Sequence, residues 1–286
     1  MRGIDASIFS FSRNSPEAAV PESTVTIPPL GAMVGFNLRL TEDAPDAGGT
    51  IVATRISAMV ASFVIRNAAG EVLCNLTGRQ LERYANEASI VGESVVAGAP
   101  GDGTAVIYER FIPISIAREE MPAYVDLTWA PTSALYSVAP TAGYTALTAS
   151  MRGLYTQEPI RTTRIKAFTP AAVAGNNSLG QLLPVGEEID RLFVLPNDAG
   201  SNPLVDDDVT DLTLTVNGFQ MLAAATIPGK FKPEDVEFRR DGHTDGVINT
   251  RLPIFVVNNA VLMTLNLGTL ADYDIVTMSR KPQQRT

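Results

Sequence analysis

The feature that most constrains the fold of this chain is an alternation of apolar and polar residues with a period of two. It recurs from one end of the sequence to the other, at residues 36–40, 112–116, 125–129 and 212–216. Successive side chains of a β-strand point to opposite faces, so this alternation predicts strands with one buried and one solvated face. The chain is therefore expected to consist mainly of antiparallel β-structure.

Helical spacing is confined to one segment, at about residues 78–87. Thr77 and Gln80 can form a capping box at its start, and Leu81, Tyr84 and Ala85 fall on one face. Because this segment interrupts strands rather than alternating with them, a parallel α/β sheet is disfavoured. The 19 prolines and 22 glycines suit many short strands joined by turns. We predict an all-β fold with one short helix near 78–87.

The strands also repeat in a fixed order along the chain. The matched segments are 29–40 with 184–195, each opening on a Pro-x-Gly turn, 63–73 with 212–222, 110–114 with 251–254, and 147–152 with 275–280. Within the second pair, Asn217-Gly218 suits a tight type I′ hairpin turn. The offset falls from 155 residues (29 to 184) to 128 (147 to 275), a drift that unequal loops produce. The order predicts a duplicated β domain; the alternative is one large β-sandwich whose strands merely look alike.

These matches set the expected domain boundaries. Residues 1–22 are expected to form an N-terminal arm, and residues 23–168 the first domain. A stretch rich in small and turn-forming residues, 169–180, has the character of a linker. Residues 181–286 are then the second domain, which ends in a short basic tail.

Composition argues against catalysis and against nucleic-acid binding. The 31 acidic and 22 basic side chains give a net charge of -9, which would repel a phosphate backbone. The single cysteine, Cys74, permits no intrachain disulfide and no thiolate cluster. The single histidine, His243, lies in a polar loop segment, and the sequence has no Gly-x-Ser-x-Gly motif. We expect a non-enzymatic protein with no cofactor and no direct nucleic-acid partner.

Two acidic clusters are the only metal candidates that the sequence offers. They are Asp206, Asp207, Asp208 and Asp211, and the pair Asp241 and Asp245. Neither cluster has the spacing of an EF-hand loop, and calcium needs six to eight oxygen ligands. Solvated turns are the preferred interpretation, with the first cluster kept as a weak candidate.

The two ends of the chain combine cations with apolar residues. The N-terminal set is Arg2, Ile4, Ile8, Phe9, Phe11 and Arg13, and the C-terminal set is Arg280, Lys281 and Arg285. If both ends emerge on the same side, they would face an anionic surface such as lipid headgroups, where each cation adds about 1 kcal/mol. The alternative is two solvated tails. The sequence contains neither a signal-peptide core nor an apolar run of the roughly 18 residues that a membrane span needs, so a soluble chain not exported by that route is expected.

Together these motifs resemble the major capsid proteins of the double jelly roll lineage, found in tailless icosahedral phages with an internal membrane. The resemblance is strongest to the small corticovirus-like members of this tectivirus and adenovirus lineage. It is carried by the Pro29-Leu30-Gly31 turn, the 63–73 hairpin leading into the 77–87 helix, and the second copy from Pro184. It implies two tandem eight-stranded antiparallel jelly rolls and a trimer with a pseudo-hexagonal outline.

The same resemblance implies a location and a set of partners. The protein would be made in the host cytoplasm and would end in the virion, as an icosahedral shell over the internal membrane. Its partners would be two further copies in a homotrimer, neighbouring capsomers, minor capsid proteins such as the penton and membrane proteins, and the lipid itself.

Two other functions remain open from the residues. A virion spike or another carbohydrate- or receptor-binding β-sandwich could stack sugars on Trp129, Tyr136 and Tyr144, which border one loop. A cupin-like enzyme is also a jelly roll, but its metal site generally needs several histidines.

Overall fold

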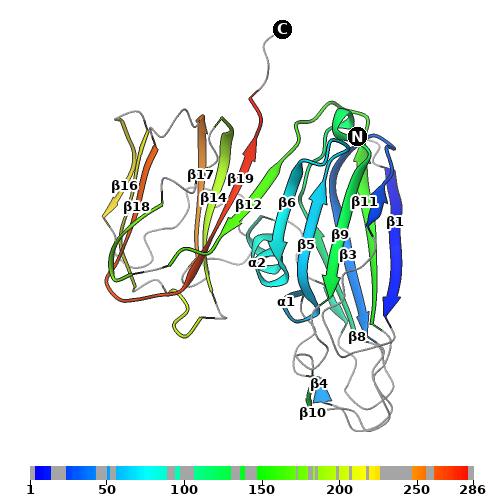
Figure 1. Cartoon of the computed structure of the whole chain (residues 1–286), viewed down its shortest axis with the longest axis horizontal. Coiled ribbons are helices and arrows are strands. Elements are labelled where there is room, and N and C mark those ends of the chain that lie inside the picture. The colour runs from blue at the N-terminus through cyan, green and yellow to red at the C-terminus, as the bar shows by residue number, and fades with distance from the viewer. Residues whose placement is uncertain are drawn as a thin grey trace. The chain divides into compact units, whose positions relative to one another are not determined.

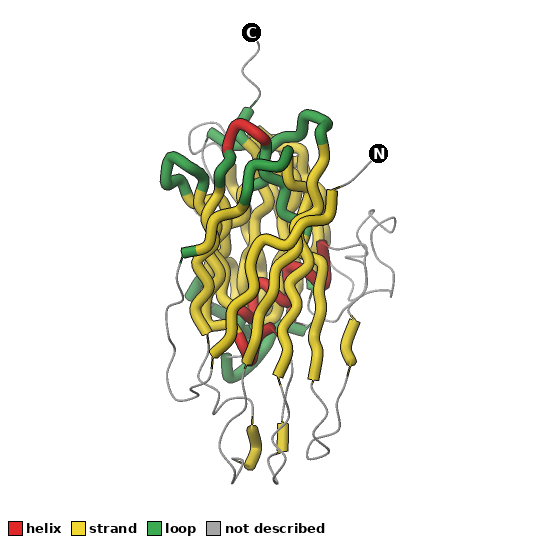
Figure 2. Tube along the Cα trace, turned by 90° about the vertical axis from the view of Figure 1, so that its right-hand side faces the viewer, coloured by secondary structure: helices red, strands yellow, loops and turns green. Residues whose placement is uncertain are grey.

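The chain forms two compact units, Met1–Thr162 and Thr163–Thr286, which are described separately here (Figure 1). The structure is a computed structural model. It describes residues 4–13, 24–42, 50–51, 56–88, 94–96, 106–129, 136–138, 147–171, 173–179, 183, 186–197, 200–205, 208–216, 219–225, 247–255 and 261–282. Strands dominate both units (Figure 2).

The first unit is a sandwich of two antiparallel sheets. Its strands are β1 (Ile4–Arg13), β2 (Val25–Ile27), β3 (Ala32–Glu42), β4 (Thr50–Ile51), β5 (Val60–Arg66), β6 (Val72–Thr77), β7 (Ser94–Val96), β8 (Val106–Ile112), β9 (Ala123–Trp129), β10 (Tyr136–Val138) and β11 (Leu147–Thr156). One sheet has the order β1-β11-β3-β8-β7, and the other has the order β6-β5-β9-β2. β4 and β10 pair separately. The helices are α1 (Ile56–Met59), α2 (Gly78–Ala88) and the 3-10 turn η1 (Arg118–Glu120).

The second unit is a smaller sandwich of the same kind. Its strands are β12 (Arg164–Phe168), β13 (Gly175–Ser178), β14 (Glu188–Pro196), β15 (Val209–Val216), β16 (Phe219–Ala225), β17 (Ile248–Phe255), β18 (Val261–Leu267) and β19 (Tyr273–Arg280). The sheet orders are β17-β14-β19-β12 and β13-β18-β15-β16, again antiparallel throughout.

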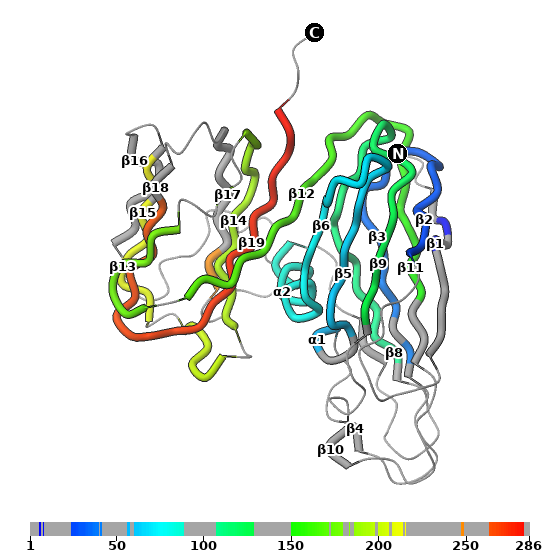
Figure 3. Tube along the Cα trace, in the orientation of Figure 1, coloured from blue at the N-terminus to red at the C-terminus, as the bar shows by residue number. Residues whose placement is uncertain are grey.

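The two units share one topology. The main strands of the first unit in chain order are β1, β2, β3, β5, β6, β8, β9 and β11, and those of the second run from β12 to β19 (Figure 3). In both units the first, eighth, third and sixth strands form one sheet, and the second, seventh, fourth and fifth form the other. This order defines a jelly roll. Each unit is therefore one jelly roll, and the predicted fold class is confirmed.

All four matches seen in the sequence lie on topologically equivalent strands. The Pro-x-Gly turns lead into β3 and β14, which are the third strands, and the hairpins are β5–β6 and β15–β16. The later matches lie on the sixth strands, β8 and β17, and the eighth strands, β11 and β19. Val216 pairs with Phe219, so only residues 217 and 218 join β15 to β16, as the Asn-Gly signal predicted. A single large sandwich is therefore excluded.

Two strands precede the Pro-x-Gly turn in each unit. Residues 4–13, expected in an N-terminal arm, form β1, which pairs with β11 from Ile4↔Tyr155 to Arg13↔Leu147. Residues 175–178, expected in the linker, form β13, which pairs with β18. The sequence Gly-Asn-Asn-Ser has turn-forming character, and here pairing with a neighbouring strand overrides local propensity.

Each unit has its own core between its sheets. In the first unit the inward positions include Phe36 and Phe63, whose rings stack with centroids 5.4 Å apart. In the second unit Leu192, Val194 and Leu265 belong to one buried cluster. Burying alternate apolar side chains from both sheets is what stabilises a sandwich.

The predicted helix is present as α2 and begins at its predicted cap. The Thr77 N–H donates to Gln80 Oε1 at 3.0 Å, and the Gln80 N–H donates to Thr77 Oγ1 at 3.2 Å, which completes the capping box. Leu81 and Tyr84 are fully buried, and the Tyr84 hydroxyl donates to the Pro113 carbonyl at 2.7 Å. The helix is thus anchored to the chain that follows β8.

Candidate assembly surfaces

The connections of each jelly roll differ in total length between its two ends. The long-loop end carries the connections after the first, third, fifth and seventh strands, and the short-loop end carries the others (Figure 1). In the first unit the connections at the long-loop end are residues 14–24, 43–59, 78–105 and 130–146. Those at its short-loop end are residues 28–31, 67–71 and 113–122. In the second unit the connections at the long-loop end are residues 169–174, 197–208, 226–247 and 268–272. Those at its short-loop end are residues 179–187, 217–218 and 256–260. Sequence that varies without disturbing the sheets can therefore accumulate at one end.

Two connections at the long-loop end are tied together in both units. In the first unit the connections after the third and seventh strands meet through the β4–β10 pair, where Ile51 pairs with Tyr136. In the second unit the Asn197 and Leu204 N–H groups donate to the Asp272 carbonyl at 3.0 and 3.1 Å. These ties fix the loops relative to the sheets.

The first acidic cluster contributes to this loop structure. Asp208 is 8% exposed; its Oδ2 accepts from the Val205 N–H at 3.0 Å and its Oδ1 accepts from the Thr269 hydroxyl. Asp211 lies on β15 and pairs with Asn266, whereas Asp206 and Asp207 lie outside the described residues. In the described part of the chain, no group of three or more His, Cys, Asp or Glu is placed to hold a metal ion. The described Asp208 carboxylate orders a loop.

The short-loop end carries the chain entry and exit of each unit. β1 begins and β11 ends there in the first unit, and β12 begins and β19 ends there in the second. Arg280 closes β19 and forms an ion pair with Asp190 at 3.2 Å, while Lys281 is exposed. Among the described helices, none is long and apolar enough to cross a membrane.

The N-terminal apolar residues are part of β1 rather than of a separate anchor. Phe9 pairs with Met151 and Phe11 with Ala149, and Ile4 and Arg13 lie at the two ends of the strand. Ile8 lies at a bulge in β1 and is half-buried. Arg2 and Arg285 lie outside the described residues.

A cluster of charged side chains around the buried Arg164, at the short-loop end of the second unit, was not foreseen from the sequence. The Glu187 carboxylate accepts from Lys166 Nζ at 3.1 Å and from the Ser279 hydroxyl, and Arg164 Nε lies 4.0 Å from it. Arg164 is 1% exposed. Its partner lies more than 20 residues further along the chain, and pairing at that separation leaves no local signal.

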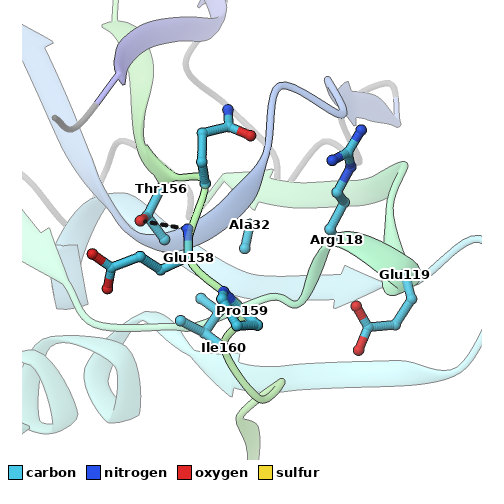
Figure 4. Close-up of a pocket in the computed structure, with 8 residues that line it drawn as sticks. Ala32, Arg118, Glu119, Thr156, Glu158, Pro159 and Ile160 are labelled. Carbon is cyan, nitrogen blue, oxygen red and sulfur yellow. Dashed lines mark hydrogen bonds between the residues drawn. The ribbon is translucent and has the colours of Figure 1, made fainter. Parts of the chain in front are cut away.

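A hollow of about 210 Å³ lies at the short-loop end of the first unit (Figure 4). Ala32, Thr156, Pro159 and Ile160 line it, together with Gln157 and the charged side chains of Arg118, Glu119 and Glu158. The Glu158 N–H donates to Thr156 Oγ1 at 3.1 Å, which shapes the turn after β11. The hollow is apolar at Ala32, Pro159 and Ile160 and carries charge at Arg118, Glu119 and Glu158.

The remaining sequence candidates do not assemble a reactive site among the described residues. Cys74 is fully buried, and burial raises the pKa of its thiol. Trp129 lies on β9 opposite Val60, and Tyr136 lies on β10. Tyr144 and His243, with Asp241 and Asp245, lie outside the described residues.

Comparison with known proteins identifies the fold. No protein-family model and no curated protein matches the sequence. The structure matches the major capsid protein of Sulfolobus turreted icosahedral virus with a TM-score of 0.64 and 12% identity, covering 99% of this chain and 98% of that one. It matches the major capsid protein P2 of bacteriophage PM2 with a TM-score of 0.55 and 10% identity, covering 100% and 99%.

A third match is VP54 of the virus PBCV-1, a structure fitted into a cryo-EM reconstruction of the virophage Sputnik. Its TM-score is 0.54 at 10% identity, and the match covers 97% of this chain and 93% of that one. These likenesses extend over both jelly rolls. The chain therefore has the double jelly roll fold of these major capsid proteins.

Proposed function

We propose that this chain is a major capsid protein, a non-enzymatic subunit that assembles into an icosahedral virion shell over an internal membrane. The observation that carries the proposal is the presence of two complete copies of one eight-stranded topology in a single chain. Three such chains around a threefold axis present six similar domains, so a trimer acquires a pseudo-hexagonal outline. That outline lets identical trimers pack side by side in a shell.

The jelly roll also suits a shell subunit for a local reason. Its two packed sheets limit the length of exposed strand edge, the usual site of uncontrolled association between sheets. In our proposal the long-loop ends face outwards, and the short-loop ends face the membrane, with the chain termini at that side. The partners are two further copies in the trimer, neighbouring capsomers, minor capsid proteins at the pentons and in the membrane, and the lipid.

The assembly state of the purified protein tests the proposal. We expect light scattering to give a mass near three times the 30.5 kDa of the chain, and electron microscopy to show larger shells or sheets. A stable monomer at every salt concentration and pH would overturn it. Micrographs of the native source should show a tailless particle that encloses a bilayer.

The membrane contact needs a test that leaves β1 intact. Deleting residues 1–13 would remove a strand paired along its length with β11, so loss of vesicle binding would be uninformative. The double substitution Arg2→Ser with Arg285→Ser is expected to weaken binding to anionic vesicles by about tenfold or more, because each cation near the surface contributes about 1 kcal/mol. Arg83→Ser on α2 serves as the control. Equal vesicle binding by the unsubstituted protein, the double variant and the Arg83→Ser control would exclude a role for the termini.

A further inference from the structure

The first unit leaves one outward sheet face partly apolar. On the sheet β1-β11-β3-β8-β7, Phe36, Leu38 and Met151 are fully buried on the core side. The alternate positions therefore face outwards, and those with described side chains include Leu154 and Arg152 on β11, Gly35, Asn37 and Arg39 on β3, and Phe111 and Glu109 on β8. Leu154 is 40% exposed and Phe111 is half-buried. An outward face in contact only with water is normally polar.

Gly35 makes this face flat at its centre. A Cβ placed on Gly35 would collide with Cζ of Phe111 and lie 2.9 Å from its Cε2, so the aromatic ring occupies the space where a side chain would stand. Leu154 pairs with Gly35 on the neighbouring strand. Leu154, Gly35 and Phe111 together form an apolar strip, named here the outer strip, across three strands.

The hollow lies directly beyond the outer strip. Ala32 on β3 and Thr156 on β11 pair with each other, two residues beyond Leu154 along β11, and both line the hollow. A cavity of about 150 Å³ accepts a benzene ring, so about 210 Å³ has room for one large apolar side chain. A flat apolar strip next to a hollow offers a partner both an area to cover and a socket to fill.

The other outward face of the same unit is different. On the sheet β6-β5-β9-β2 most outward positions are polar, namely Ser62, Asn75, Thr77, Asp126 and Thr128, and two are apolar, Val64 and Val72. Asp126 there forms an ion pair with Arg66 and accepts from the Thr24 hydroxyl at 2.5 Å. Val64 pairs with Asn75 and Asp126, and Val72 pairs with Arg66, so no apolar strip crosses the strands of this face. The outer strip is therefore the candidate interface of the two.

The duplication allows the exposure of this face to be compared between the two copies. In the second unit, the equivalent sheet is β17-β14-β19-β12, and its core side carries Leu192, Val194 and Ile275. Its outward positions Phe193, Leu195 and Val276 are also buried, at no more than 1% exposed. The same face of the same fold is therefore buried in one copy and partly exposed in the other.

We propose that the outer strip and the adjacent hollow form a docking surface for a second copy of this chain. This inference deepens the proposed capsid function and rests on it. The described charges around the strip are two exposed arginines, Arg39 and Arg152, and the half-buried Glu109. A face with this excess of cations suits contact with a second copy, because each copy carries a net charge of -9.

The chain offers a closely matched pair of positions for the test. Leu154 on the outer strip and Val72 on β6 are both apolar and both 40% exposed. We expect Leu154→Asp to raise the concentration at which trimers dissociate by about tenfold or more, because it places a charge in a desolvated contact. Val72→Asp should leave that concentration unchanged, and circular dichroism should show both variants folded.

A thiol assay provides a second measurement that does not depend on a charged substitution. Cys74 is fully buried, so Leu154→Cys or Val72→Cys supplies the one accessible thiol among the described residues. In assembled protein, a bulky maleimide should modify Cys at position 72 and spare position 154. Dilution below the dissociation concentration should then expose position 154.

The outcomes separate this inference from the proposed function. If the unsubstituted protein remains a monomer, the capsid function fails. If it forms trimers but Leu154→Asp associates as tightly as the unsubstituted protein, only the docking surface is overturned. Protection of position 154 in the diluted monomer would also overturn the docking surface, because a second copy could not be the cause.

Discussion

Two tyrosines are buried without a hydrogen-bond partner for their hydroxyls among the described residues. They are Tyr155 on β11 and Tyr273 on β19, both no more than 1% exposed. An unsatisfied buried hydroxyl costs about 1–3 kcal/mol. Tyr155→Phe removes the hydroxyl and keeps the ring, so we expect an equal or higher free energy of unfolding in urea. Tyr124→Phe, at a half-exposed position, should change it by less than about 0.5 kcal/mol.

The same two residues predict a loss of stability at alkaline pH. Burial raises the pKa of Tyr155 and of Tyr273 from 10 to about 12, because the phenolate would lose its hydration. The unfolded chain releases these protons first, so their contribution to stability is complete below pH 10 and is lost as the pH rises towards 12. Urea titrations across this range should show the loss. A Tyr155→Phe and Tyr273→Phe double variant that loses stability as steeply would contradict the assignment.

Whether a residue's role could be predicted depended on the distance to its partner along the chain. Thr77 and Gln80 are three residues apart, and their capping box was evident from the sequence. Ser279 and Glu187 are 92 residues apart, and only the pairing of strands brings them together. The outer strip was missed for the same reason, because Gly35, Phe111 and Leu154 become neighbours only through the sheet register.

At the scale of elements, the first residue of α2 predicts a glycine-to-alanine substitution that lowers stability although it raises helix propensity. Gly78 is the first helical residue, and helix propensity alone would make Gly78→Ala stabilising by up to about 1 kcal/mol. A Cβ there would collide with the Val60 carbonyl oxygen and lie 2.7 Å from that of Ile56. We therefore expect Gly78→Ala to lower the melting temperature. Asn86→Ala, at an exposed position of the same helix, should raise it slightly.

The strand β13 depends on one side chain. Asn177 is 6% exposed; its Nδ2 donates to the carbonyls of Val173 at 2.8 Å and Gly175 at 3.0 Å, and its Oδ1 accepts from the Val173 N–H at 3.0 Å. Asn177→Ala should lower the free energy of unfolding by about 1–3 kcal/mol, because these part-buried backbone groups and the buried Leu265 carbonyl, 3.3 Å from Nδ2, lose their partner. The neighbouring exposed residue provides the control, since Asn176→Ala should be nearly neutral. Similar losses in both variants would contradict this role.

The same strand explains where the predicted domain boundaries departed from the structure. Alternation and turn signals identified the third, fourth, fifth, sixth and eighth strands of each copy, because these strands carry apolar side chains on one face. β13 has the composition of a turn, and β1 was interpreted as an arm. Both are strands at the edge of a sheet, held by one neighbouring strand, β18 or β11, rather than by their own propensity.

At the scale of the whole molecule, the order of the repeated segments along the chain was what predicted the fold. Each matched segment alone was a common β pattern, but four matches occurred in the same order in both halves of the chain. One of them is a hairpin, so together they correspond to the third, fourth, fifth, sixth and eighth strands of two identical topologies. The offsets drifted because the connections differ in length between copies, as between residues 43–59 and 197–208. Sequence order thus predicted the architecture, whereas the docking surface that we propose depends on strand register and needed the structure.

Net charge makes a prediction for assembly as a whole. Copies that each carry a charge of -9 repel one another over a distance that salt shortens, from about 30 Å at 0.01 M to about 8 Å at 0.15 M. We therefore expect the trimer, and the larger assemblies built from it, to form at lower protein concentration as salt rises through this range. Light scattering over a dilution series at each salt concentration measures the shift.

The isoelectric point supplies the control for this charge effect. Near pH 4.7 the net charge approaches zero, so repulsion disappears and the salt dependence should disappear with it. Assembly that weakens with salt at neutral pH would instead mean that ion pairs between copies dominate the interface. The apolar outer strip argues against that outcome, because the contact it offers comes mainly from burial of Leu154 and Phe111, which salt does not screen.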